Sequence, residues 1–251
     1  MRSRILIILF LALGLNACAQ DKVKTCKVSV VSEFPHDATS YTQGLFFHDG
    51  KMYESTGQYG SSTFRADVDL ASGEPARRLD FGRKYFVEGS VILGDKLYIL
   101  TWTNKVAFVY DASTLEYIQT YRYPREGWGL TTDGKQLIAS DGSANLYFLD
   151  EQLRQTGRVT VTLRGRPVTL LNELEYIGGK VWANVYTTDM IVVIDPKTGK
   201  VETTIDCSGL LPQQLRTPDT DVLNGIAHDP STGRTFITGK NWKRLYEIEL
   251  K

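Results

Sequence analysis

The sequence predicts an all-β protein, and three observations support this class. Short apolar segments alternate with turns rich in Gly, Asp and Asn, which is typical of strands joined by tight hairpins. Long helical periodicity is absent, since the segment "LLPQQLR" from Leu210 is at most a short helix. The third observation is a repeat that recurs along most of the 251 residues. Together they favour strands organised as repeated units.

Each repeat contains an apolar strand, a turn with Gly or Asp, a basic or polar residue and a second apolar strand. The five copies are "QGLFFHDGKMYESTG" from Gln43, "EGSVILGDKLYILTW" from Glu88, "WGLTTDGKQLIASD" from Trp128, "NELEYIGGKVWANVY" from Asn172 and "NGIAHDPSTGRTFITGK" from Asn224. A third strand that ends near an acid follows most of them, as in "AFVYDAST" and "IVVIDPKTG". A period of about 40–50 residues with several short strands is typical of a propeller blade. The sequence therefore predicts a five-bladed β-propeller with four-stranded antiparallel blades.

The last repeat ends after three strands, with "LYEIELK" at the end of the chain. The N-terminal segment "CKVSVVSEF" is a spare strand, and we expect it to close the last blade as its fourth strand. Such closure leaves only short, protected sheet edges. An open β-sandwich is the alternative, and the regular period disfavours it. The predicted propeller is one domain spanning residues 26–251.

The first residues have the composition of a secretory leader. Residues 1–17 combine two arginines with an apolar run, and Leu15-Asn16-Ala17-Cys18 ends it in a lipobox-like cysteine. The run is shorter than the roughly 20 residues that a membrane span needs, although an uncleaved anchor is the alternative. We expect lipidation of Cys18, a tether over residues 18–25, and attachment to the periplasmic or cell-surface face of a bacterial membrane.

Composition excludes several classes of protein. The 29 basic and 29 acidic residues form no basic stripe, so nucleic acid is not an expected partner. His36, His48 and His228 lack the spacing of metal ligands, and no phosphate-binding loop, dinucleotide fingerprint or nucleophile elbow is present. Cys26 and Cys207 could form a disulfide in an oxidising compartment, but their spacing leaves this open.

The repeat predicts where side chains meet. The first strand of each blade lines the axis of a propeller, so the residue at its entrance occurs once per blade near the axis. This inner ring contains Gln43, Glu88, Trp128, Asn172 and Asn224. The second strand returns to the same face and contributes a wider ring of Gly57, Trp102, Asp141, Tyr186 and Lys240. Apolar walls with a few polar groups are typical of a small-ligand pocket.

Each ring member also has a structural interpretation. The tryptophans could pack between blades, the asparagines could cap turns, and Asp141 with Lys240 could form a rim ion pair of little energetic value. Glu88 is the hardest to explain in this way, because a carboxylate flanked by Phe86 and Val87 must be paired or functional. Strand alternation turns Glu173 away from its ring neighbour, so we expect Glu173 and Glu175 to be structural.

Eight motifs allow a family to be identified. They are "YTQGL", "YESTGQYGSS", "EGWGLTTDG", "SDGS", "LNELEY", "WANVYTTD", "DVLNGIAHD" and "TGKNW". In this order they resemble the plant-type glutaminyl-peptide cyclotransferases, exemplified by the papaya-latex enzyme, and their bacterial relatives. The likeness extends from about Phe34 to Leu250. It implies a five-bladed β-propeller that converts N-terminal glutamine to pyroglutamate with release of ammonia, unrelated to the zinc-dependent animal cyclases.

The resemblance also implies roles for residues. Glu88 matches the acid–base glutamate, while Asn172 and Lys240 match groups that polarise the γ-carbonyl and hold the oxyanion. The residues expected to bind the substrate are Tyr41, Gln43, Trp102, Trp128, Tyr186 and Asn224. Tyr186 stands where the family often has Trp, and Val87 replaces a glycine beside the acid. None of these departures removes a catalytic group.

The resemblance implies peptides or proteins with N-terminal Gln as substrates, a monomer, and no metal or cofactor in catalysis. A structural calcium, seen in propellers of this kind, remains open. Two other functions are alternatives. One is a propeller that captures peptide N-termini without turnover. The other is a metal-dependent, lactonase-like enzyme in which Glu88, Asn172 and Asn224 bind a cation.

Overall fold

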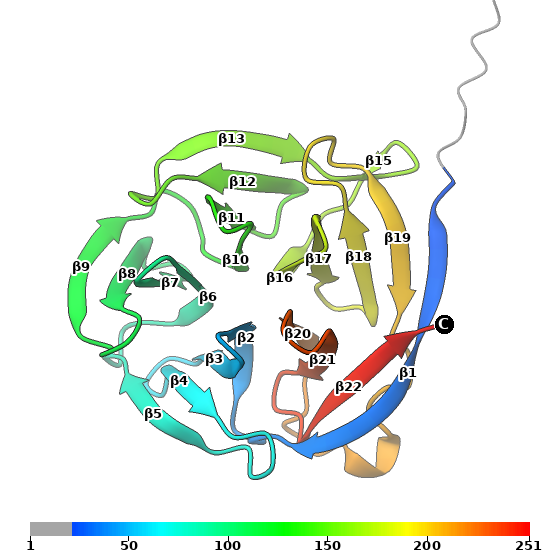
Figure 1. Cartoon of the computed structure of the whole chain (residues 1–251), viewed down its shortest axis with the longest axis horizontal. Helices are drawn as coiled ribbons and strands as arrows, with labels where there is room; N and C mark the ends of the chain where they lie inside the picture. Colours follow the sequence, from blue (N-terminus) through cyan, green and yellow to red (C-terminus); the bar gives the residue numbers. More distant parts are fainter. Residues whose placement is uncertain (1–21) are drawn as a thin grey trace, which may run out of the picture.

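The computed structural model describes residues 22–251, which fold mainly into β-strands. They form three four-stranded sheets, one eight-stranded sheet and one two-stranded sheet. Figure 1 shows the larger sheets arranged like sectors around a central axis, with β2, β6, β10, β16 and β20 nearest to it. The predicted all-β class is confirmed, and the arrangement is that of a β-propeller. The predicted leader, Cys18 and most of the tether lie outside the described residues.

The four-stranded sheets follow the sequence order of their strands. The first contains β2 (Tyr41–His48), β3 (Lys51–Gly57), β4 (Thr63–Val68) and β5 (Pro75–Asp80). The second contains β6 (Val87–Leu93), β7 (Lys96–Thr101), β8 (Val106–Asp111) and β9 (Tyr117–Arg122). The third contains β10 (Leu130–Thr132), β11 (Leu137–Ala139), β12 (Asn145–Leu149) and β13 (Gln155–Thr160).

The eight-stranded sheet combines strands from both ends of the described chain. Its order is β16 (Leu171–Ile177), β17 (Lys180–Val185), β18 (Met190–Ile194), β19 (Val201–Asp206), β1 (Lys24–Pro35), β22 (Arg244–Leu250), β21 (Arg234–Gly239) and β20 (Leu223–Asp229). The small hairpin pairs β14 (Thr162–Leu163) with β15 (Arg166–Pro167). The short helix expected near Leu210 is the 3-10 helix η1 (Gln213–Leu215).

Strand β1 pairs with two partners. From Val28 to Pro35 it runs antiparallel to β22, as predicted for the N-terminal strand. Its first residues, Lys24 to Lys27, pair in parallel with β19, which the sequence analysis does not predict. The last two residues of the predicted tether, Lys24 and Thr25, are therefore part of this strand. Strand β1 thus joins the β16–β19 group to the β20–β22 group.

The hydrophobic core is divided into clusters between neighbouring sheets. In one cluster Phe46 and Phe64 from the first sheet pack with Val87 and Ile99 from the second. Alternating side chains of each strand face opposite sides of its sheet, so both faces can contribute to a core. Val87 is fully buried in this cluster. The residue that replaces the family's glycine therefore packs between sheets.

The acids that recur at the end of each third strand form tight turns. Asp111, for example, accepts hydrogen bonds from the backbone N–H groups of Ser113 and Thr114, at 2.9 and 2.8 Å, and from the Ser113 hydroxyl. These hydrogen bonds lower the pKa of Asp111 to about 2. The corresponding acids with similar turns are Asp69, Asp150 and Asp195. Their recurrence reflects turn formation.

Cys26 and Cys207 are both buried and free. Within residues 22–251, no helix has the length and apolar character required to cross a membrane.

Candidate active site

Irregularities in strand pairing orient the inner-ring side chains. Pairing registers shift between Thr42 and Gly44, Val87 and Ser90, Leu171 and Leu174, and Leu223 and Ile226. The inner-ring residues inside these intervals are Gln43, Glu88, Asn172 and Asn224. Such a bulge places an extra residue outside the regular ladder and redirects its side chain. A β-bulge therefore recurs at the entrance of four inner strands.

A glycine follows four of the five inner-ring residues, and two of these glycines allow the closest contacts between neighbouring inner strands. A Cβ atom on Gly89 would lie 2.5 Å from the backbone nitrogen of Leu130. A Cβ atom on Gly129 would lie 2.1 Å from the carbonyl oxygen of Asn172. Contacts of this length are sterically forbidden, so the backbones can approach each other around the axis only at glycine.

The exception is Glu173, which follows Asn172. Its carboxyl group is buried and accepts hydrogen bonds from the backbone N–H groups of Leu45, at 3.3 Å, and Ile226, at 2.9 Å. Glu175 similarly accepts a hydrogen bond from the N–H of His228 at 2.9 Å. Both acids satisfy backbone donors of other inner strands. The structural interpretation of Glu173 and Glu175 agrees with these contacts.

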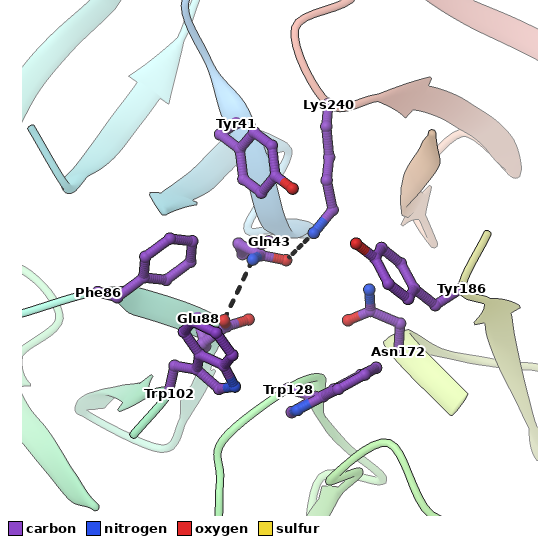
Figure 2. A pocket seen from close by; sticks show the side chains of 9 residues that line it. All are labelled: Tyr41, Gln43, Phe86, Glu88, Trp102, Trp128, Asn172, Tyr186 and Lys240. Atoms are coloured by element: carbon purple, nitrogen blue, oxygen red, sulfur yellow. Dashed lines mark hydrogen bonds between the residues drawn. The ribbon is translucent and has the colours of Figure 1, made fainter. Parts of the chain in front are cut away.

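Eight of the nine predicted site residues line one cavity of about 190 Å³, and Asn224 is the exception. It is lined by Tyr41, Gln43, Phe86, Glu88, Trp102, Trp128, Asn172, Tyr186 and Lys240. Figure 2 shows Glu88 and Trp102 on one side and Lys240, Tyr186 and Asn172 on the other. Aromatic rings form the walls, and Trp128 meets Tyr186 edge to face with 5.6 Å between ring centroids. The cavity can hold one small polar side chain.

Three ring residues do not line this cavity. Asn224 is buried outside the cavity lining and its Nδ2 donates to the carbonyl oxygen of Thr42 at 2.9 Å, while its role in substrate binding stays a prediction. Gly57 instead provides space for a neighbouring ring, because a Cβ there would lie 2.2 Å from Phe86. Asp141 accepts a hydrogen bond from the N–H of Ser143 in a turn. The three residues considered as cation ligands, Glu88, Asn172 and Asn224, therefore do not share one cavity wall.

A chain of hydrogen bonds connects the lysine to the acid. Nζ of Lys240 donates to Oε1 of Gln43 at 2.7 Å, and Nε2 of Gln43 donates to Oε1 of Glu88 at 3.1 Å (Figure 2). Both ends of the Gln43 amide are thus occupied. Gln43 holds Lys240 and Glu88 in relation to each other, and because it also lines the cavity its role in positioning substrate stays a prediction.

Burial changes the titration of both charged groups. Burial raises the pKa of Glu88 well above its ordinary value; Lys240 opposes this rise and the negative charge of Glu126 adds to it. Burial lowers the pKa of Lys240 to about 8, against the opposing effect of Glu88 and Asp221. The Nζ of Lys240 also lies 4.4 Å from the centroid of the Tyr41 ring. Lys240 can therefore change protonation state near neutral pH, and the neutral form of Glu88 is favoured more than that of an exposed glutamate.

Asn172 contributes an unused acceptor. Its side chain is only 2% exposed, and its Oδ1 has no hydrogen-bond partner among the described residues. A buried polar atom without a partner costs free energy unless a ligand or water supplies one. Figure 2 shows the amide of Asn172 directed into the cavity. The site thus offers a vacant acceptor opposite Glu88.

Three contributors to the site were not predicted from the sequence. Phe86 lines the wall, and its position two residues before Glu88 was the available signal. Asp221 accepts a hydrogen bond from the Tyr41 hydroxyl at 2.9 Å. Glu126 accepts hydrogen bonds from the indoles of both pocket tryptophans. Glu126 and Asp221 are the first residues of the quoted motifs "EGWGLTTDG" and "DVLNGIAHD", but no repeat position marks either of them.

The chain is similar to known proteins in both sequence and structure. A family model described as glutamine cyclotransferase matches residues 5–250. The chain is 42% identical over 230 residues to a glutaminyl-peptide cyclotransferase of Arabidopsis thaliana, covering 90% of this chain and 72% of that protein. The crystal structure of Myxococcus xanthus glutaminyl cyclase superposes with a TM-score of 0.85 at 38% identity, covering 92% of this chain and 99% of that chain.

A more distant match supports the fold alone. The WD40 β-propeller domain of Doa1 has a TM-score of 0.50 at 11% identity, covering 82% of this chain and 62% of that chain. The family model spans nearly the whole chain, and the Arabidopsis and Myxococcus proteins share well over 30% of their residues with it. This protein belongs to the glutamine cyclotransferase family.

Proposed function

We infer that this protein is a glutaminyl-peptide cyclotransferase that converts the N-terminal glutamine of peptides or proteins to pyroglutamate and ammonia. The observation that carries the proposal is the buried carboxyl of Glu88 in a cavity sized for one polar side chain, opposite Asn172 and Lys240. Family membership and the relatives named above support the same activity.

The reaction needs little more than placement and proton transfer. The neutral α-amine attacks the γ-carboxamide carbon of the same residue, so a new C–N bond forms while the carbonyl becomes an oxyanion. The amine must then lose a proton, and the departing amide nitrogen must gain one as its C–N bond breaks. Because nucleophile and electrophile belong to one side chain, holding it in a folded conformation supplies a large part of the rate.

Glu88 is suited to both proton transfers. As a carboxylate it takes the proton from the α-amine, and as an acid it gives that proton to the leaving nitrogen. An exposed carboxyl would stay ionised at neutral pH, but burial raises the pKa of Glu88 well above its ordinary value. The hydrogen bond from Gln43 fixes the Oε1 atom of Glu88.

Asn172 and Lys240 account for the electrophilic half of the reaction. Protonated Lys240 stabilises the oxyanion. Asn172 can pair with a carboxamide through two hydrogen bonds, its Nδ2 donating to the γ-oxygen and its vacant Oδ1 accepting from the γ-nitrogen. A carboxylate substrate has no N–H for the Oδ1 of Asn172. The site therefore favours N-terminal glutamine over glutamate.

We also propose that the propeller has five blades. The eight-stranded sheet divides into two four-stranded groups, β16–β19 and β20–β22 with β1, at the strand that changes partner. The five hydrophobic clusters support this count, because each combines residues of two neighbouring groups and the last returns to the first sheet.

A dipeptide assay tests the function. Purified protein is incubated with a Gln-initiated dipeptide, and ammonia and pyroglutamate are measured against the spontaneous rate. Glu88→Gln is expected to keep its melting temperature and lose roughly 10²-fold or more in kcat. Glu116→Gln, at an exposed glutamate, is the matched control. Folded wild-type protein that binds the peptide without cyclising it would instead support a binding propeller.

A further inference from the structure

One carboxylate oxygen of Glu126 accepts hydrogen bonds from both pocket tryptophans. Nε1 of Trp102 lies 2.9 Å from Oε2 of Glu126, and Nε1 of Trp128 lies 3.2 Å from the same atom. An indole nitrogen can only donate, whereas a carboxylate oxygen can accept from more than one donor. Trp102 directly follows β7 of the second sheet and Trp128 lies just before β10 of the third, so Glu126 connects two walls of the cavity.

The backbone around Glu126 is held firmly. Glu126 lies in the connection between β9 and β10, where the N–H of Gly127 donates to the carbonyl oxygen of Thr101 at 3.0 Å. A Cβ atom on Gly127 would lie 2.6 Å from the Cβ of Leu100, so the connection rests directly on β7. The backbone next to Glu126 is thereby held against β7, the strand that Trp102 directly follows.

The side chain of Arg125, the residue before Glu126, makes its contacts away from the Glu126 carboxylate. The guanidinium of Arg125 donates to Oε1 of Gln155 at 2.7 Å and lies 4.0 Å from the centroid of the Tyr147 ring. It is therefore directed toward the outer strands of the third sheet, whereas the Glu126 carboxylate contacts the pocket tryptophans. The negative charge of Glu126 remains close to the catalytic cavity.

We propose that Glu126 is a positioning residue for cyclisation, which fixes the indoles of Trp102 and Trp128 as substrate walls and sets the electrostatic environment of Glu88. This inference rests on the function proposed above. Rigid walls fold the glutamine side chain back on itself, which is the main requirement of an intramolecular attack.

The charge of Glu126 changes the pKa of Glu88 in a defined direction. Burial, Lys240 and Glu126 are the influences that act on Glu88, and Glu126 raises the pKa of Glu88. The other polar neighbours, Gln43 and Asn172, are neutral. Removing the charge of Glu126 therefore lowers the pKa of Glu88 and moves the acid limb of the kcat profile to lower pH.

Two substitutions separate the two effects. Glu126→Gln removes the charge but keeps a carbonyl oxygen that can accept both indole N–H groups. It is expected to move the acid limb to lower pH with KM near the wild-type value. Glu126→Ala removes charge and acceptor, so the same shift is expected with KM raised about tenfold. The exposed-site variant Glu116→Gln should change neither quantity.

Spectroscopy provides readouts that do not need turnover. The chain has four tryptophans, and Glu126→Ala is expected to move two indole N–H signals in a ¹⁵N–¹H spectrum. Carboxyl ¹³C titration, with the Glu88 signal assigned through Glu88→Gln, should show a lower pKa for Glu88 in both Glu126 variants. Glu116→Gln should leave the spectra unchanged.

The outcomes are distinguishable. Unchanged indole signals and unchanged KM in Glu126→Ala would overturn the positioning role. An unchanged Glu88 titration in Glu126→Gln would overturn the electrostatic role. If folded wild-type protein fails to cyclise Gln peptides, the proposed function falls, while the indole signals and the Glu88 titration still decide what Glu126 does.

Discussion

Replacing Lys240 by methionine should lower kcat by an amount that depends on pH. Methionine keeps most of the volume of the buried side chain but removes the charge that stabilises the oxyanion. Loss of one such donor costs roughly 10²–10³ in kcat at pH 7. Because burial lowers the pKa of Lys240 to about 8, the wild-type lysine is about nine-tenths protonated at pH 7 and about one-tenth at pH 9.

The direction of the pH effect on kcat follows from the titration of Lys240. Only protonated Lys240 can stabilise the oxyanion, so the wild-type advantage is complete below the folded pKa and declines as the pH rises through it. The ratio of wild-type to variant kcat should therefore fall about tenfold between pH 7 and pH 9. The ratio cancels the titration of the substrate amine, which affects both enzymes equally.

The assay is ammonia release from a saturating Gln dipeptide between pH 6 and 10. Saturation matters because kcat reports groups in the enzyme–substrate complex. Lys243→Met, at an exposed lysine three residues later, is the control and should match the wild type. A constant ratio from pH 7 to pH 9, or an equal loss in the control, would refute the assigned role of Lys240.

Three further outcomes are expected. Gly129→Ala should lower the free energy of unfolding by about 1–3 kcal/mol in urea titrations, because its Cβ meets the backbone of Asn172, whereas Gly82→Ala should be nearly neutral because only ordinary contacts surround it. Glu173→Gln should cost about 1–3 kcal/mol by the same measurement, since one buried backbone N–H loses its acceptor; an unchanged midpoint would contradict that contact. EDTA should leave kcat unchanged, because side chains supply the proposed proton transfer and oxyanion contacts.

The repeat predicted the site well because each inner strand contributes one entrance residue. That regularity placed Glu88, Trp128 and Asn172 near one another without any knowledge of the third dimension. The regularity does not predict that Asn224 lies outside the cavity lining, with its side chain hydrogen-bonded to the backbone of Thr42. The position of a residue in the repeat determines its distance from the axis. It does not determine whether neighbouring strands cover its side chain.

Other features depended on contacts that no local pattern records. Glu126 contacts two indoles that lie beside different sheets. Gln43 occupies the expected place, but its role depends on Lys240, which lies far away in the sequence. No turn or periodicity in the sequence indicates the parallel pairing of Lys24 with Thr203. Such features follow from which distant segments meet, so one sequence without its fold does not specify them.

The double pairing of β1 has a consequence for how the chain reaches its native state. Residue Val28 pairs with Leu250, so the contact that completes the ring joins positions separated by nearly the entire folded domain. During synthesis β1 emerges first and must wait for β22, with its backbone donors and acceptors unpaired. Contacts of such long sequence separation slow folding, and an unpaired edge can recruit other chains. Ring completion is therefore the step at which misassembly competes with folding.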